Sequence, residues 1–212
     1  MNAYETAVAL WNQNHFVGVS DINMARFGRA CHFALVNHAE KRRKSGQSFF
    51  IHDCRTAHRI LKAKLPFELA IVMLMHEAKE DDGWTDEMLK DLLGEEIALA
   101  VHYLSKLPKT EFKKRQGRLN NHIATLDLAV EQGNWWVPVA KLDDRVDNNT
   151  DTAGLSKIHL NRLFRETRSD FIPYFDRSRK IIPVEHLTTY DLWLFEVENA
   201  CANYERSLAL QR

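Results

Sequence analysis

A histidine and a group of carboxylates lie close together in the middle of the chain. His76 is followed by Glu77, Glu80 and Asp81, at the end of the apolar run 69–75. On a helix these four side chains project into one sector, because successive residues are about 100° apart. Carboxylates repel one another at a helix C-terminus unless a cation lies among them, and imidazole and carboxylate groups are common ligands of divalent cations. The alternative is a solvated acidic helix end.

A second acidic group and a separate histidine could complete such a site. Asp143, Asp144 and Asp147 precede Asn148, and on a helix Asp144 and Asn148 share one face. His52 follows an aromatic pair earlier in the chain. Taken alone, the acidic group is compatible with an exposed helix end, and His52 with a structural role.

A basic run precedes His52. Lys41-Arg42-Arg43-Lys44 is followed by Ser45 and Gly46. Such a run is typical of a solvated surface, but beside a cation it would supply donors for a phosphate-bearing anion. The sequence has no P-loop, dinucleotide fingerprint or nucleophile elbow, and Cys31 has no evident base beside it. Nucleophilic thiol chemistry is therefore not indicated.

The elements that must position these residues are predicted to be helices throughout, so the fold class is all-α. Apolar periodicity, with Asp21 and Thr85 as caps, predicts helices at about 21–43, 52–64, 66–80, a segment after Thr85, 95–105, 110–131, 135–148, 155–176 and 185–210. The third of these is apolar nearly all round, which predicts a central helix. The last has an a/d stripe, which favours packing back on the domain over a homodimer seam.

Length and composition restrict the class of protein. The chain has 212 residues, 8 glycines and 5 prolines, which favours one helical domain over residues 1–212 rather than a turn-rich β fold. Lys plus Arg and Asp plus Glu are equal at 29 each, so a general nucleic-acid binder is not expected. No apolar run is long enough for a membrane span, and no basic signal-peptide region begins the chain. Three cysteines without metal-like spacing fit a reducing cytoplasm.

Four segments together resemble the HD hydrolase domain of Rel/SpoT proteins, over about residues 25–165. They are Arg43-Lys44-Ser45-Gly46 with Phe50-Ile51-His52, His76-Glu77 with Glu80-Asp81, Ser105-Lys106-Leu107, and Lys141-Leu142-Asp143-Asp144-Arg145 with Asn148. Their order and intervals agree with the family's R-K-S-G-x-P-Y-x-x-H, H-D-x-x-E-D, T-K-L and K-L-A-D-R-x-x-N strings. The chain is most similar to the stand-alone small alarmone hydrolases, and the resemblance implies an HD-domain bundle of roughly eight to ten helices.

The resemblance also implies an activity and a set of roles. The family hydrolyses the 3′-pyrophosphate of ppGpp and pppGpp, giving GDP or GTP and pyrophosphate. By this resemblance one Mn²⁺ would be bound by His52, His76, Glu77 and Asp144, while Glu80 and Asp81 would orient or deprotonate the attacking water. The substrate would be held by Arg43, Lys44, Ser45, Lys106 and Asn148.

Three positions depart from the family strings. Glu77 stands where the family has aspartate, and its extra methylene is large against the tolerance of about 0.2 Å in metal–ligand distances. Phe49 replaces a proline before the aromatic residue, so the basic loop is expected to have a different shape. Asp151 stands where threonine is usual, and a carboxylate there would face a nucleotide polyphosphate unfavourably.

Two alternatives follow from these departures. Asp151 and Phe49 favour an HD-fold phosphohydrolase that acts on another nucleotide, such as an adenosine alarmone or NADPH. Glu77 favours a non-catalytic nucleotide-binding or interaction module, with the a/d stripe as its partner surface. Metal content and turnover separate the three hypotheses.

Overall fold

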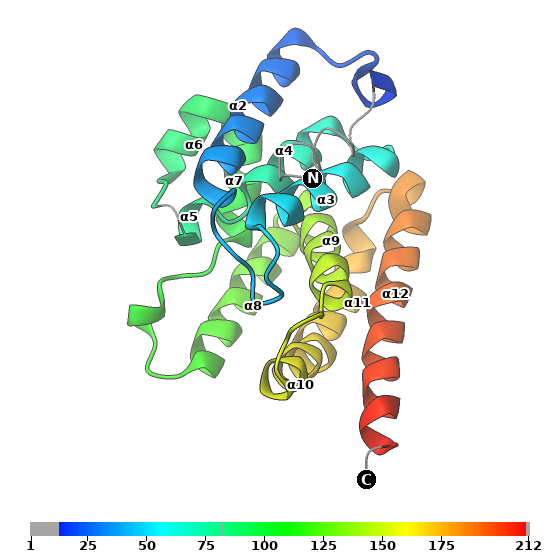
Figure 1. The fold of residues 1–212 in the computed structure, drawn as a ribbon. Helices are drawn as coiled ribbons and strands as arrows, with labels where there is room; N and C mark the ends of the chain where they lie inside the picture. Colours follow the sequence, from blue (N-terminus) through cyan, green and yellow to red (C-terminus); the bar gives the residue numbers. More distant parts are fainter. Residues whose placement is uncertain (1–12, 82, 211–212) are drawn as a thin grey trace.

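The computed structural model describes residues 13–81 and 83–210, and their regular elements are helical (Figure 1). The α-helices are α2 (Asp21–His38), α3 (Phe49–Lys62), α4 (Phe67–Met75), α5 (Ala78–Asp81), α6 (Asp86–Leu93), α7 (Glu95–Leu104), α8 (Arg115–Glu131), α9 (Trp136–Thr150), α10 (Lys157–Glu166), α11 (Ile172–Ser178) and α12 (Val184–Ala209). Short 3₁₀ turns lie at Gln13–Phe16, Lys109–Glu111 and Arg179–Ile181. Within the described ranges the extended backbone amounts to one isolated bridge, between Arg42 and Ser48. The predicted all-α class is confirmed.

Helix α4 lies at the centre, as its uniformly apolar sequence predicts. Its residues from Leu69 to Met75 are fully buried, and it packs against α2, α3, α7 and α9. The helix is shorter than expected, because it ends at Met75 instead of continuing to residue 80. His76 Nδ1 donates to the Met73 carbonyl at 2.6 Å, and the chain turns there before α5 begins. His76 and Glu77 therefore lie on a turn, not on a continuous helix.

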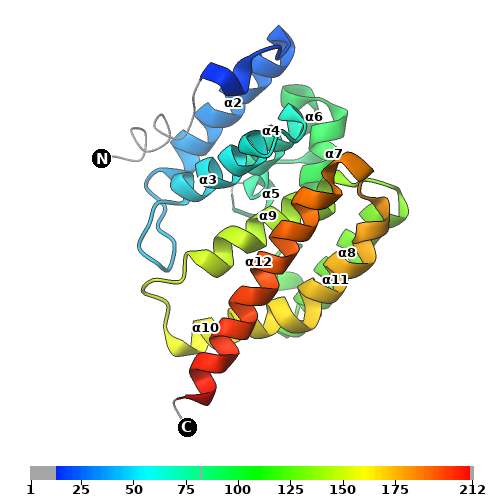
Figure 2. The same cartoon turned by 90° about the vertical axis from the view of Figure 1, so that its right-hand side faces the viewer.

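Helix α9 is the second central element. Every residue of α9 except Asn148 and Thr150 is buried. Helix α3 packs against it, and α12 lies along its other side (Figure 2). The charged residues in its sequence therefore lose contact with water and must find partners inside the protein.

The segment between α2 and α3 is a loop that differs from the expected helix. Helix α2 ends at His38, and its N-cap is Ser20, whose hydroxyl accepts from Asn23 N, so Asp21 is the first helical residue and not the cap. Ser48 caps α3 and accepts from Phe50 N at 3.2 Å. Its hydroxyl also donates to the carbonyl of Ala39 at 2.8 Å. These hydrogen bonds fix residues 39–48 as an ordered connection.

The C-terminal part of the chain packs back on the rest. Tyr190, Leu194, Val197 and Cys201 of the a/d stripe are buried within the monomer, which supports the intramolecular interpretation. The expected helix 155–176 is divided into α10, a π-helical turn at Thr167–Phe171 and α11. Pro173 at the start of α11 lacks the N–H that a continuous α-helix needs at that position.

None of the helices within the described residues is both long and apolar enough to cross a membrane.

Candidate active site

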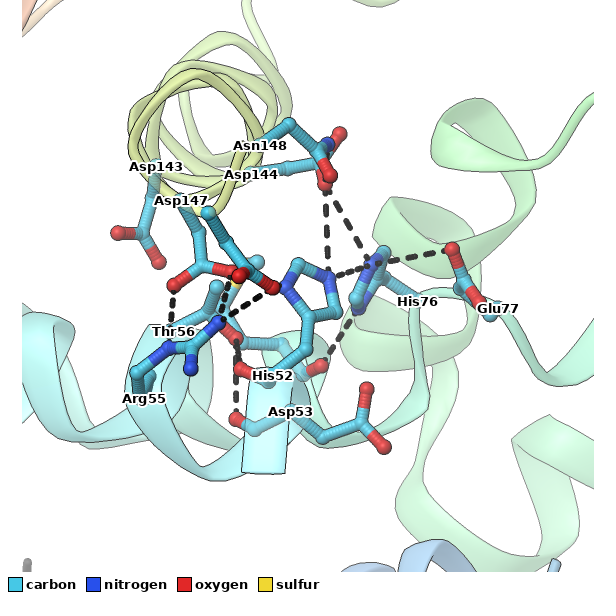
Figure 3. Close-up of polar contacts among 12 residues, drawn as sticks. His52, Asp53, Arg55, Thr56, His76, Glu77, Asp143, Asp144, Asp147 and Asn148 are labelled. Atoms are coloured by element: carbon cyan, nitrogen blue, oxygen red, sulfur yellow. Dashed lines mark hydrogen bonds and ion pairs between the residues drawn. The ribbon is translucent and has the colours of Figure 1, made fainter. Parts of the chain in front are cut away.

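Two histidines from different elements face each other beside α9. His52 lies in the first turns of α3 and His76 on the turn after α4, and their Nε2 atoms are 3.3 Å apart (Figure 3). The Nδ1 of His52 contacts Asp147 Oδ2 at 2.7 Å, and that of His76 contacts the Met73 carbonyl at 2.6 Å. A carboxylate and a carbonyl can only accept, so the hydrogen of each neutral ring is on Nδ1. Both Nε2 lone pairs then point into the same space.

Two carboxylates complete this group. Asp144 Oδ1 lies 3.6 Å from His52 Nε2 and 3.9 Å from His76 Nε2. Glu77 Oε1 lies 3.9 Å from His76 Nε2, and Glu77 Oε2 is buried without a hydrogen-bond partner among the described residues. Figure 3 shows all four side chains converging from α3, α9 and the turn after α4. These are the four residues that the sequence resemblance predicts as metal ligands.

The chemistry of this group fits a divalent cation. Imidazole nitrogens that share one cation at about 2.1 Å lie roughly 3 to 3.4 Å apart. Two facing lone pairs and two carboxylates repel one another without a positive charge between them. The orphaned oxygen of Glu77 is a further donor that lacks a partner. His52, His76, Glu77 and Asp144 thus form a candidate metal site with nitrogen and oxygen donors.

Buried charges around Asp144 keep it ionised. Lys141 Nζ donates to its Oδ2 at 2.9 Å, and Asn148 Nδ2 donates to its Oδ1 at 2.6 Å. Although burial opposes it, the Lys141 charge holds the pKa of Asp144 well below its usual range. For Glu77 the neighbouring charges do not outweigh the effect of burial, which raises its pKa to about 7. Of the two carboxyl groups, Asp144 is therefore the one held more firmly in its anionic form.

Asp53 is a carboxylate near the histidines that the sequence analysis did not single out. Donor atoms of Asp53, His52 and His76 lie within 4.8 Å of one another. Its Oδ2 pairs with His38 Nδ1 at 2.6 Å. Figure 3 shows its carboxyl group on the opposite side of the two imidazoles from Asp144. Asp53 thus lies behind the histidine pair, away from the space into which Asp144 points.

The predicted catalytic Glu80 is held by cations. Its Oε1 accepts from Lys106, at 2.9 Å from the backbone N and 3.1 Å from Nζ, and its Oε2 accepts from Arg118 at 3.3 Å. Burial opposes ionisation, but the Lys106 charge and hydrogen bonds lower the pKa of Glu80. Lys106, which was predicted to contact phosphate, is therefore a partner of Glu80. The side chain of Asp81 lies outside what the structure describes.

A cleft of about 290 Å³ opens beside the histidine pair. Most of the predicted substrate and metal residues line it, namely Arg43, Lys44, Ser45, His52, Glu77 and Asn148. Other charged residues of its wall were not predicted as site residues, namely Arg115, Arg145, His159, Arg162 and Glu166. Arg145 belongs to a quoted motif, but the others come from α8 and α10 and form no local pattern. The excess of cationic side chains suits an anionic ligand.

The departures from the family strings have defined places in the cleft. Asp151 Oδ2 accepts from Ser45 Oγ at 3.0 Å and lies 3.3 Å from both Arg43 Nη1 and Arg55 Nη2. Two guanidinium groups thus offset its charge, so it does not present the bare carboxylate that the sequence suggested. Phe49 begins α3 and lines the cleft.

Comparisons with known proteins agree with the resemblance found in the sequence. No family model matches the chain. It is 28% identical over 149 residues to the guanosine-3′,5′-bis(diphosphate) 3′-pyrophosphohydrolase of Aquifex aeolicus. The matched segment covers 70% of this chain and 21% of the relative. The Haemophilus influenzae protein of the same name is 29% identical over 150 residues, 71% of this chain and 21% of the relative. The chain therefore spans about a fifth of the length of the curated relatives it matches.

A solved structure shares the fold. It is that of a metazoan orthologue of SpoT that hydrolyses ppGpp and plays a role in starvation responses. The TM-score is 0.60 at 16% sequence identity, and the match covers 84% of this chain and 95% of that one. The helical HD-domain arrangement expected from the sequence is thereby confirmed.

Proposed function

Because the chain is a homologue of the Rel/SpoT-type pyrophosphohydrolases, we propose that it hydrolyses the 3′-pyrophosphate of guanosine alarmones. The substrates would be ppGpp and pppGpp, and the products GDP or GTP and pyrophosphate. In this reaction the oxygen of a water molecule bonds to the phosphorus that is attached to the ribose 3′ oxygen. The bond between that phosphorus and the 3′ oxygen breaks, and the 3′ oxygen takes a proton. The observation that carries the proposal is the 3.3 Å approach of the His52 and His76 Nε2 atoms beside Asp144.

In this proposal His52, His76, Glu77 and Asp144 hold one divalent cation, with Mn²⁺ as the expected ion. When bound, the cation lowers the pKa of water and polarises a phosphoryl oxygen. The Nδ1 hydrogen bonds of both histidines hold their Nε2 atoms toward it.

Glu80 and Asp81 are proposed to orient and deprotonate the attacking water. Lys106 and Arg118 keep Glu80 anionic, and an anionic carboxylate accepts a hydrogen bond from water. The proposed role of Glu80 and Asp81 is general-base assistance, which typically contributes about 10²- to 10⁴-fold in rate.

The substrate side is proposed to be the cationic wall of the cleft. Arg43, Lys44 and Ser45 come from the loop 39–48, and Asn148 from α9. Cationic groups opposite the metal site would offset the charge of a nucleotide that carries two pyrophosphates. Lys106, which already binds Glu80, is proposed to act on the phosphate side of the substrate.

A turnover assay tests the proposal. The purified protein is incubated with ppGpp and Mn²⁺, and the nucleotides are separated by ion exchange. We expect GDP and pyrophosphate, lost with EDTA and in Asp144→Asn. The matched control is Asp127→Asn, which removes an exposed carboxylate bound to Arg177 far from the cleft and should retain wild-type turnover.

The alternatives give different results in the same assay. Bound Mn²⁺ without ppGpp turnover would support another nucleotide, the alternative that the sequence departures at Asp151 and Phe49 favour. A substrate panel that includes an adenosine alarmone and NADPH then identifies it. Absence of both Mn²⁺ binding and turnover would support the non-catalytic module.

A further inference from the structure

One carboxylate joins the candidate metal site to the loop that precedes it. Asp147 is buried in α9 and accepts from three side chains. These are His52 Nδ1 at 2.7 Å, Arg43 Nη1 at 2.7 Å, and Arg55 through Nε at 2.7 Å and Nη2 at 2.8 Å. Figure 3 shows the Arg55 fork and the His52 ring meeting on the Asp147 carboxylate.

We propose that Asp147, together with Arg55, is a positioning residue that fixes the His52 ring for cation binding and ties the loop 39–48 to it. The inference rests on the cation site of the proposed function. It concerns residues to which no role has been given in that function.

The Asp147 carboxylate fixes the tautomer of His52. Because a carboxylate only accepts, the hydrogen of the His52 ring is confined to Nδ1 and the lone pair to Nε2, which faces His76. Carboxylate partners of this kind fix the orientation of a ligating imidazole and increase its basicity. Without Asp147, the ring could carry its hydrogen on Nε2 or rotate away.

Arg55 orients the Asp147 carboxylate. Its Nε and Nη2 bind the two oxygens of Asp147 in a parallel, bidentate arrangement, which sets the plane of the carboxylate. The third donor of the fork, Nη1, hydrogen-bonds Gln47 Oε1 in the loop. Arg55 thus connects the His52 partner with the loop.

Asp147 also contacts a proposed substrate residue. Arg43 donates to Asp147 Oδ2 at 2.7 Å and to Asn148 Oδ1 at 2.5 Å. Arg43 lines the cleft and is a proposed substrate residue. Displacement of the Asp147 carboxylate would therefore disturb both His52 and Arg43.

The fold supplies a matched control. Asp143 lies one turn before Asp147 on α9 and pairs with Arg59 of α3 at 2.5 Å. It is equally buried at the same helix interface, and its described hydrogen-bond partners do not include a histidine. Asp143→Asn and Asp147→Asn thus make the same substitution at neighbouring buried carboxylates, of which only Asp147 hydrogen-bonds His52. Arg59 also lies 3.5 Å from Asp147, between its Nη2 and Oδ1, so Asp143→Asn additionally tests whether Arg59 alone affects the site.

The experiment measures Mn²⁺ affinity by calorimetry on wild type, Asp147→Asn, Arg55→Lys and Asp143→Asn. We expect about a 10- to 100-fold loss for Asp147→Asn, a smaller loss for Arg55→Lys, and less than a twofold change for Asp143→Asn. Arg55→Lys keeps the charge on a half-buried side chain, so it tests the proposal even where Asp147→Asn folds poorly. In metal-free protein, ¹⁵N NMR of the His52 ring should show the Nδ1–H form in wild type and a mixture in Asp147→Asn.

The outcomes separate this inference from the proposed function. Wild-type Mn²⁺ affinity in both Asp147→Asn and Arg55→Lys, or an equal loss in Asp143→Asn, would overturn the inference whatever the turnover. A wild type that binds Mn²⁺ without hydrolysing ppGpp would contradict the proposed function and leave the affinity comparison valid. A wild type without Mn²⁺ affinity would overturn both.

Discussion

At Glu77 the requirements of stability conflict with those of the proposed metal binding. It stands where the Rel/SpoT strings have aspartate, and its carboxyl group lies beside the histidines with Oε2 unpartnered. Burial raises its pKa to about 7. A buried carboxylate without a cation destabilises the fold, whereas the same carboxylate is useful as a ligand.

We therefore predict that Glu77→Gln stabilises the metal-free protein at high pH and weakens its binding of Mn²⁺. Because the folded pKa is raised, the stability that protonated Glu77 contributes is present below about pH 4.5 and is lost as pH rises through 7. The loss amounts to roughly 3 kcal/mol at most. Urea unfolding of the metal-free proteins, in the presence of EDTA and from pH 5 to 8, measures this loss of stability. A parallel pH profile for wild type and Glu77→Gln would contradict this account.

His122 should lower the stability of the protein in acid, the opposite pH dependence to that of Glu77. Both of its ring nitrogens are buried without hydrogen-bond partners in the described part of the chain, and burial together with the Lys141 charge lowers its pKa well below 6.5. Its neutral form therefore stabilises the fold above pH 6.5, and this contribution is lost as pH falls. Between pH 6.5 and 5.5 wild type should lose about 1 kcal/mol more than His122→Leu. Equal losses in chemical unfolding would show that His122 is protonated in the native state.

At the scale of elements, the N-cap of α3 fixes where the candidate site begins. Ser48 is buried, caps α3 and binds the carbonyls of His38 and Ala39 at the end of α2. His52 lies four residues later in the same helix, so the cap sets both the loop and the first histidine. Thr85 caps α6 in the same way, but at an exposed position.

The two caps should differ in their contribution to stability. Thr85→Ala removes one exposed cap and should lower the free energy of unfolding by about 1 kcal/mol. Ser48→Ala also removes the hydroxyl donor to the carbonyl of buried His38 and should cost about 2 kcal/mol or more. Urea unfolding of the metal-free proteins gives both values. If the two variants lose the same stability, the hydrogen bonds of Ser48 to the end of α2 contribute nothing.

At the scale of the whole molecule, α12 covers α9, the helix that carries Asp144 and Asp147. Val197 of α12 is fully buried, whereas Leu192 on the same helix is 63% exposed. The a/d stripe is thus largely used inside the monomer. The position of α9, and with it that of Asp144 and Asp147, depends on this packing.

We predict that Val197→Ala lowers the stability of the entire protein by about 2 kcal/mol in a single cooperative transition, because it opens a cavity in the buried core under α12. Leu192→Ala should change stability by less than about 0.5 kcal/mol. Thermal unfolding of both variants at several protein concentrations makes the comparison. A concentration-dependent loss in Leu192→Ala would instead indicate that the exposed face of α12 forms a homodimer.

The sequence by itself determined the all-α class, the central helix, the cap at Thr85 and the resemblance that groups His52, His76, Glu77 and Asp144. The helices and the cap depend on local periodicity and on capping residues, which act over a few residues along the chain. The grouping of the four site residues depends on the resemblance of motifs spread over about residues 25–165. Helix ends were less well predicted. Met75 ends α4 because the His76 ring takes the Met73 carbonyl, and Pro173 divides the expected helix 155–176.

Only the tertiary structure decided which charges meet. It paired Glu80 with Lys106, surrounded Asp151 with Arg43 and Arg55, and brought Arg115 and Arg162 to the cleft. His52 and its partner Asp147 are 95 residues apart in the chain. A buried charge is neutralised by whichever opposite group the packing of helices brings within hydrogen-bond distance, and no local pattern encodes that partner.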